Sequence, residues 1–266
     1  MSASRDGKEI AGLLFSRFHD PRYIHPDPLE IVREYPDPLE REVAALVCAA
    51  FALGNVKAII SFERDLLRRL GSPRNACMGM DPHELTRLLA SVRYRFYRTE
   101  EIAALLAGIG SVLREYGSLN AAFLRFLVPD AADTREALRS FVRLVRAGGG
   151  GGECVLPDPE KDSACKRLHL FLKWVVRSDS IDPGGWKGVS TRQLLIPVDT
   201  HILRVSRILG YTKRKTADIR TSLEITAALR EIDPEDPVKF DFSLTRPGIH
   251  PCLSYECLDE WRKRTA

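Results

Sequence analysis

Apolar residues recur at helical spacing along most of this chain, and the strict alternation that marks a half-buried strand is absent. The clearest helix has apolar side chains at i, i+3, i+4 and i+7, namely Leu138, Phe141, Val142 and Val145. Similar patterns predict further helices over residues 42–53, 56–70, 82–91, 99–116, 119–127, 162–177, 199–210, 216–231 and 234–242. We therefore expect an all-α protein with almost no sheet.

Two segments interrupt the helical pattern. Five consecutive glycines, Gly148 to Gly152, are followed by Pro157 and Pro159, which predicts a flexible surface loop. No Lys-Ser or Lys-Thr pair follows these glycines, so they do not match a phosphate-binding P-loop. The second segment, residues 179–190, is rich in glycine and separates two predicted helices.

Composition places the chain among ordinary globular proteins, with 44% hydrophobic and 29% charged residues. Its 266 residues suffice for one domain of two lobes or for two small domains. No apolar run approaches the roughly 18 to 20 residues of a membrane span, and the patch Ile10–Phe15 is too short for a secretory signal. We expect a cytoplasmic protein.

The spacing of the cysteines and the net charge of the chain narrow the possible functions only slightly. The six cysteines have no framework spacing, which in a cytosolic protein predicts reduced thiols. A formal net charge of +4 permits a polyanionic partner without requiring one.

The helix expected over residues 162–177 carries a basic stripe opposite its apolar face. At 100° per residue, Lys166, Lys173 and Arg177 fall together. This stripe faces either solvent or a DNA-binding cleft. Lys166 lies in the first turn, where the helix dipole disfavours a protonated amine, and Arg167 acts in the same direction. An activated amine and an ordinary surface lysine both fit these features.

Asp199 begins the next informative helix. It is a good N-cap, Val198 and Leu203 occupy the staple positions, and Gly210 stands where a helix ends. A structural cap thus explains Asp199 without any chemistry.

A metal site is the other possibility at Asp199, together with His201. The pattern His250-x-Cys252 followed by Cys257 suggests a second one. Neither supplies four convergent ligands at zinc-site spacing, so we expect no metal.

The segment Ile196-Pro197-Val198-Asp199-Thr200-His201-Ile202-Leu203-Arg204-Val205 resembles the motif that carries the catalytic aspartate of endonuclease III and its relatives, the HhH-GPD DNA glycosylases. The whole chain is similar to a prokaryotic branch of that superfamily, itself resembling archaeal 8-oxoguanine DNA glycosylases. The pieces that carry this similarity are Arg22-Tyr23, His25-Pro26-Asp27-Pro28-Leu29, Arg93-Tyr94-Arg95-Phe96, Tyr116-Gly117-Ser118-Leu119, Ser163-Ala164-Cys165-Lys166-Arg167-Leu168 and Asp236-Pro237-Val238-Lys239-Phe240-Asp241-Phe242.

The resemblance implies two helical lobes with an active-site cleft between them. Residues 38–195 would form a central lobe carrying Lys166, and residues 1–37 with 196–266 a second lobe carrying Asp199. Two departures stand out. The Leu-Pro-Gly-Val-Gly hairpin expected before Lys166 is replaced by Pro157-Asp158-Pro159-Glu160 and Ser163-Ala164. An iron–sulfur cluster needs four cysteines, and the C-terminal region offers only Cys252 and Cys257, so we expect no cofactor.

The activity implied by the resemblance is that of a DNA glycosylase with AP-lyase activity. Lys166 would attack C1′ of a damaged nucleotide, such as one with an oxidised purine, to give a Schiff base, and Asp199 would stabilise charge on the sugar. The implied partner is double-stranded DNA containing a damaged base, bound by a nucleoid-associated monomer. The residues expected at the DNA are Asn55, Arg93, Arg95, Arg167, Lys173, Arg177, His201, Lys213 and Arg214.

Several alternatives stay open. Asn55 is either a residue inserted into the gap left by a flipped base or a helix-boundary asparagine. His169, Trp174 and Trp186 are expected to be structural. The whole protein could instead be a non-catalytic nucleic-acid-binding module, an enzyme for glycosidic bonds of another nucleoside, or, more remotely, a metal-dependent hydrolase.

Overall fold

The computed structural model describes residues 5–150, 155–160, 163–249 and 255, and the regular structure within them is helical, as expected. Three short 3₁₀-helices, Pro21–Tyr23, Thr191–Gln193 and Pro237–Phe240, accompany the α-helices. The α-helices are α1 (Arg5–Phe18), α2 (Leu29–Val32), α3 (Pro38–Phe51), α4 (Val56–Leu70), α5 (Pro73–Gly79), α6 (Pro82–Leu88), α7 (Thr99–Tyr116), α8 (Leu119–Leu124), α9 (Arg135–Gly148), α10 (Lys166–Val176), α11 (Thr200–Ile208), α12 (Ile219–Arg230) and α13 (Asp241–Ile249). Among the described helices, none combines the length with the apolar character that crossing a bilayer requires.

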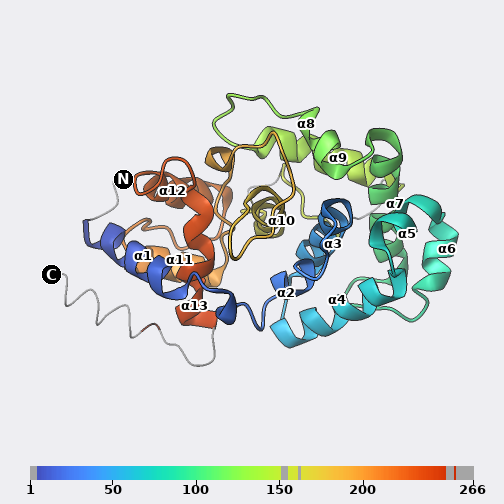
Figure 1. The fold of residues 1–266 in the computed structure, drawn as a ribbon, viewed down its shortest axis with the longest axis horizontal. Helices are drawn as coiled ribbons and strands as arrows, with labels where there is room; N and C mark the ends of the chain where they lie inside the picture. The colour runs from blue at the N-terminus through green and yellow to red at the C-terminus, as the bar shows by residue number, and fades with distance from the viewer. Residues whose placement is uncertain (1–4, 151–154, 161–162, 250–254, 256–266) are drawn as a thin grey trace.

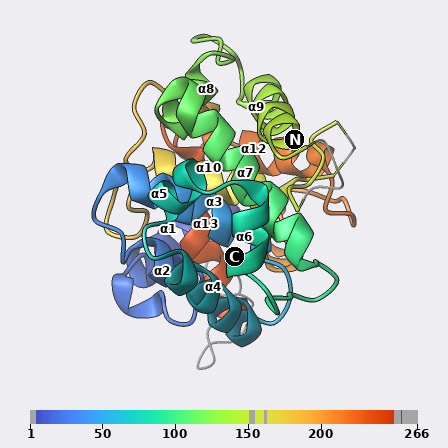
Figure 2. The same ribbon diagram turned by 90° about the vertical axis from the view of Figure 1, so that its right-hand side faces the viewer.

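The helices form two groups with α10 between them (Figure 1). One group holds α1, α11, α12 and α13, and within this group α1 packs against α13. The other holds α3 to α9, with α8 and α9 at the top and α4 at the bottom when that side faces the viewer (Figure 2). Helix α10 packs against α3 and so joins the groups. The exact residue boundaries of the two expected lobes stay a prediction.

Helix α3 is the centre of the second group. From Glu42 to Phe51 every side chain is buried, and α3 packs against α2, α5 and α10. The buried Glu42 carboxylate accepts hydrogen bonds from the backbone N–H groups of Leu119 and Asn120 at 2.8 and 3.0 Å, and from Trp186 Nε1 at 2.7 Å. These donors offset the cost of burying a polar group.

The first glycines of the expected flexible loop are packed instead. Gly148 ends α9, and a Cβ on Gly149 would lie 2.3 Å from the carbonyl oxygen of Ala104 in α7. Reciprocally, a Cβ on Gly108 would lie 2.1 Å from the carbonyl oxygen of Val145. Here glycine permits two helix backbones to approach closely, so the loop prediction is wrong for Gly148 and Gly149; residues 151–154 lie outside the described part.

The C-terminal region differs most from the expected helices. The helix predicted over 234–242 is a short 3₁₀ turn, Pro237–Phe240, and the α-helix starts only at Asp241. Pro247 lies inside α13, in its last turns, where its missing N–H removes one hydrogen bond of the helix. Asp241 is the first residue of α13.

Candidate functional site

A cleft of about 710 Å³ opens between the two groups of helices. Its walls include the first turns of α10 and α11, the segment 52–56 that connects α3 to α4, and residues of α13. A volume of this size suits a ligand as large as a nucleotide, since small-molecule pockets run from about 300 to 1,000 Å³. The cleft draws together residues that are far apart in the sequence.

Lys166 and Asp199 face each other in this cleft. Lys166 Nζ lies 3.3 Å from Asp199 Oδ2, and the two side chains are 35% and 19% exposed. The other oxygen, Asp199 Oδ1, accepts hydrogen bonds from the N–H groups of His201 and Ile202 at 2.9 and 2.8 Å. Asp199 is therefore the N-cap of α11 through one oxygen and the partner of Lys166 through the other.

Lys166 is positioned by the start of α10. Cys165 precedes the helix with a left-handed backbone (φ +43°), and its N–H donates to Ser163 Oγ at 3.2 Å. The next residue, Arg167, donates through Nη1 to the carbonyl oxygens of Ala50 and Val155. Arg167 lines the cleft as expected for a DNA contact, but Nη1 is already used to hold α10 against the end of α3.

Lys173 and Arg177 do not face DNA, which corrects the prediction made for them. They are 2% and 3% exposed. Lys173 Nζ lies 3.0 Å from Asp182 Oδ1 and 3.2 Å from Asp241 Oδ2. The predicted stripe exists, but the segment after α10 and the start of α13 cover its far end, so phosphate groups cannot reach these two cations.

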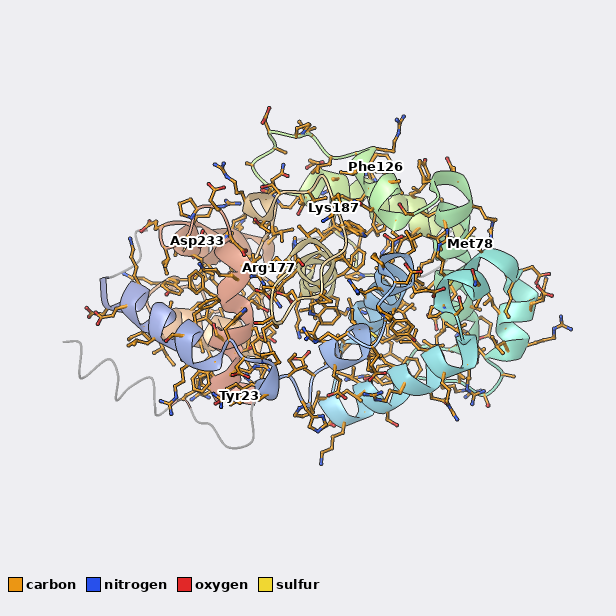
Figure 3. All side chains as sticks on the ribbon, in the orientation of Figure 1. Tyr23, Met78, Phe126, Arg177, Lys187 and Asp233 are labelled. Atoms are coloured by element: carbon orange, nitrogen blue, oxygen red, sulfur yellow. The ribbon has the colours of Figure 1, made fainter. Side chains whose placement is uncertain are left out.

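Arg177 extends the buried ionic network. It pairs with Asp179 at 2.7 Å, with Asp236 at 2.9 Å and with Asp182. Burial lowers the pKa of Arg177, but the surrounding carboxylates outweigh it and the pKa is raised overall. Figure 3 shows Arg177 in the middle of the molecule, between the two groups of helices.

Asp241 is a cleft residue to which the sequence analysis gave no role. It lines the cleft with Lys166 and Asp199, and its Oδ2 is held by Lys173. Burial raises the pKa of Asp241 against the effect of Lys173, and the charge of Asp199 raises it further. In the sequence analysis Asp241 belonged to the segment Asp236–Phe242, which was cited only for its resemblance. The helix expected over 234–242 did not place Asp241 at the start of a helix that borders the cleft.

Besides Arg167, two further expected DNA contacts lie in the cleft wall. Asn55 is exposed, and its side-chain oxygen caps α4 by accepting from the N–H groups of Lys57 and Ala58. His201 is half-buried, with Nδ1 2.8 Å from Tyr255 Oη. Asn55 is thus a helix cap that also borders the cleft.

The remaining expected DNA contacts lie outside the cleft. Arg93 and Arg95 are exposed around the tight turn Tyr94–Tyr97, and Arg95 Nη1 donates to Leu53 O at 3.3 Å, which places this turn at the mouth. Lys213 is exposed in the segment that precedes α12. Arg214 is paired with Asp218 at 2.6 Å.

No group of three or more metal-ligating side chains occurs within the described residues. His250, Cys252 and Cys257 lie outside them. Cys48, Cys77 and Cys165 are buried free thiols. His169, Trp174 and Trp186 are buried, and burial lowers the pKa of His169 to about 4.

Comparison with known families matches residues 27–250 to the family described as "Protein of unknown function (DUF2400)". The expected membership of the HhH-GPD glycosylase superfamily is wrong by this finding, since the match is to DUF2400. No curated protein and no solved structure matches the chain. Because the matched segment covers most of its length, the chain belongs to the DUF2400 family.

Proposed function

We propose that this protein is a DNA glycosylase with AP-lyase activity. The observation that carries the proposal is the amine of Lys166 placed 3.3 Å from the carboxylate of Asp199 inside a cleft of nucleotide size. Covalent catalysis through a Schiff base uses an accessible amine beside a group that can take its proton. Membership of DUF2400 prescribes no reaction, so the proposal rests on these residues alone.

The reaction begins with a nucleotide turned out of the duplex into the cleft, because its sugar is out of reach inside the helix. Lys166 attacks C1′ as the bond to the base breaks. Asp199 stabilises the positive charge that develops on the sugar; a fixed charge of this kind is worth about 3 to 4 kcal/mol at the transition state. The sugar then opens to a Schiff base, from which strand cleavage follows.

Lys166 must be neutral when it attacks, and Asp199 is placed to pass its proton to water at the exposed end of the pair, which leaves Asp199 ionised for the charge on the sugar. The separation of Nζ and Oδ2, 3.3 Å, is close to hydrogen-bond reach, and such contacts shorten when substrate binds. Asp199 Oδ1 is fixed by two backbone N–H groups, so Oδ2 cannot turn away from the amine without losing the cap. The amine and the carboxylate are therefore already in position before substrate binds.

The turn at the mouth of the cleft supports duplex DNA as the partner. Phe96 is 64% exposed at its tip, and Arg93, Arg95 and Arg98 are exposed beside it. An exposed apolar side chain between cations suits insertion beside an unstacked base, with the arginines on the phosphates. A protein that bound free nucleosides would not need such a turn.

The test is borohydride trapping on duplexes carrying 8-oxoguanine, uracil, an alkylated base or an abasic site. We expect a covalent adduct with the wild type and none with Lys166→Gln. Lys187→Gln is the matched control, because Lys187 is exposed and lies near α8, outside the cleft (Figure 3). An adduct that survives Lys166→Gln would contradict the assignment. Tight duplex binding without adduct or base release would favour a non-catalytic binding module.

A further inference from the structure

We propose that Asp241 is a second catalytic carboxyl of the cleft, and that it donates a proton to the base as the base departs. This inference rests on the proposed glycosylase activity and adds to it the residue that acts on the leaving group. Asp199 and Lys166 account for the sugar side of the reaction. Neither of them supplies a proton to the other side of the breaking bond.

The position of Asp241 suits this role. Its side chain is 10% exposed and lines the cleft that holds Lys166 and Asp199. Oδ2 is fixed by Lys173 Nζ at 3.2 Å. Oδ1 takes no part in this ion pair, and because the residue lines the cleft we assign Oδ1 to the substrate side.

The charges around Asp241 favour its protonated form. The buried part of the ionic network holds Lys173 and Arg177 with Asp182 and Asp241, while Asp179 and Asp236 are about a quarter exposed and Asp179 also contacts His19 Nε2 at 2.9 Å. Arg177 alone contacts three of these four carboxylates, so Asp241 is left to share Lys173 with Asp182. Asp182 is fully buried beside the same lysine, and Asp199 lines the same cleft, so two further carboxylates oppose a negative charge on Asp241.

The pKa of Asp241 agrees with this arrangement. Burial raises it, Lys173 lowers it, and Asp199 and Asp182 raise it again. On α13 itself the nearest charged group is Arg246, which is occupied by Asp27 at 3.1 Å and by the carbonyl oxygen of Tyr23. Asp182 and Asp199 belong to other segments that face Asp241 and act in the same direction.

The proton balance closes through water. Asp241 gives its proton to an acceptor atom of the base as the C1′–N bond breaks, so the base leaves without charge. Lys166 forms its bond to C1′ and becomes a cationic amine. Loss of a proton from that nitrogen to water, and return of a proton from water to the Asp241 carboxylate, restore the starting acid. Water is the only other reactant, and Asp241 is needed only for the departure of the base.

The deciding experiment compares two substrates that need Asp241 differently. Base release from a damaged duplex needs the acid, whereas trapping on a preformed abasic site does not, because the base has already gone. We expect Asp241→Asn to slow base release by about 10² to 10⁴-fold and to leave trapping on abasic DNA within about threefold of the wild type. Retained trapping also shows that the variant is folded with Lys166 in place.

Asp236→Asn is the matched control, since it removes a carboxylate from the same network outside the cleft. We expect this variant to release base as the wild type does. Unchanged base release in Asp241→Asn, or an equal loss on both substrates, would overturn the role of Asp241 alone. A wild type that neither releases base nor traps abasic DNA would overturn the proposed function, and this inference with it.

Discussion

The two ends of α10 carry the same residue type on the same helical face and in opposite surroundings. Lys166 is 35% exposed and has one carboxylate partner, Asp199. Lys173, two turns further on, is 2% exposed and has two, Asp182 and Asp241. One end borders a cleft, and the other is enclosed by the segment that follows the helix.

Under the proposed function, this difference separates a reactive lysine from a structural one. A lysine available for chemistry needs access for substrate and a partner that can take its proton. A lysine enclosed by carboxylates on several sides keeps its proton and holds the fold together. Lys173 also contacts Asp241, so the buried end of the helix positions a residue of the cleft that Lys166 borders.

The largest effect expected from the comparison is on stability. Lys173→Met leaves Asp241 without its cation and Asp182 with Arg177 alone, and should lower the free energy of unfolding by about 3 to 5 kcal/mol. Lys166→Met, at the exposed end, should change it by no more than about 0.5 kcal/mol. Denaturant titration of both variants measures the difference. Equal losses would mean that the two ends do not differ as described.

The next effect separates the two functions of Asp199. Asp199→Asn keeps a good N-cap but removes the charge facing Lys166, so we expect base release to fall by about 10² to 10³-fold with little loss of stability. Asp199→Ala removes both, and should cost about 1 kcal/mol of stability in addition. Kinetics and denaturation of the pair test this. An Asp199→Asn variant with full activity would leave Asp199 as a cap only.

His169, one turn after Lys166, gives a pH test of the buried part of the helix. Burial lowers its pKa from the usual 6.5 to about 4, so the unfolded chain binds the proton more readily than the folded one. The stabilisation is complete above pH 6.5 and is lost as the pH falls toward 4, by about 3 kcal/mol in all. His169→Leu should remove this dependence from the unfolding free energy. Exposed His83→Leu should keep it.

The smallest effect concerns the mouth of the cleft. Arg93 is exposed beside the turn that carries Phe96, so Arg93→Ala should reduce the slope of log affinity for duplex DNA against log salt by about 0.9. Arg87→Ala, an exposed arginine on α6, is the control and should leave the slope unchanged. An unaltered slope in Arg93→Ala would remove this turn from the DNA-binding surface.

Much of the fold followed from local patterns. Periodicity located α4 and α7 to the residue, and the capping signature of Asp199 was correct in detail. These features depend on neighbours within one or two turns, which a sequence displays directly. Helix α13 was misplaced because the apolar pattern over 234–242 does not show where the 3₁₀ turn Pro237–Phe240 ends, and the helices that pack against α13, α1 and α11, are distant in the sequence.

The same reasoning identified only some residues of the candidate site. Lys166 and Asp199 were singled out from their helix starts and a motif, and the structure brings them together. The basic stripe was predicted with the right face but the wrong environment, because helical geometry fixes which side chains align and not what covers them. Asp241 was missed for the same reason, since its partner Lys173 is 68 positions away in the sequence.

The packing of α1 against α13 has a consequence for how the molecule is made. Helix α1 is synthesised before α13, the helix that packs against it, which begins more than 220 residues later at Asp241. Contacts over so long a separation close late and slowly. The α3–α9 group can therefore fold while the apolar face of α1 is still uncovered.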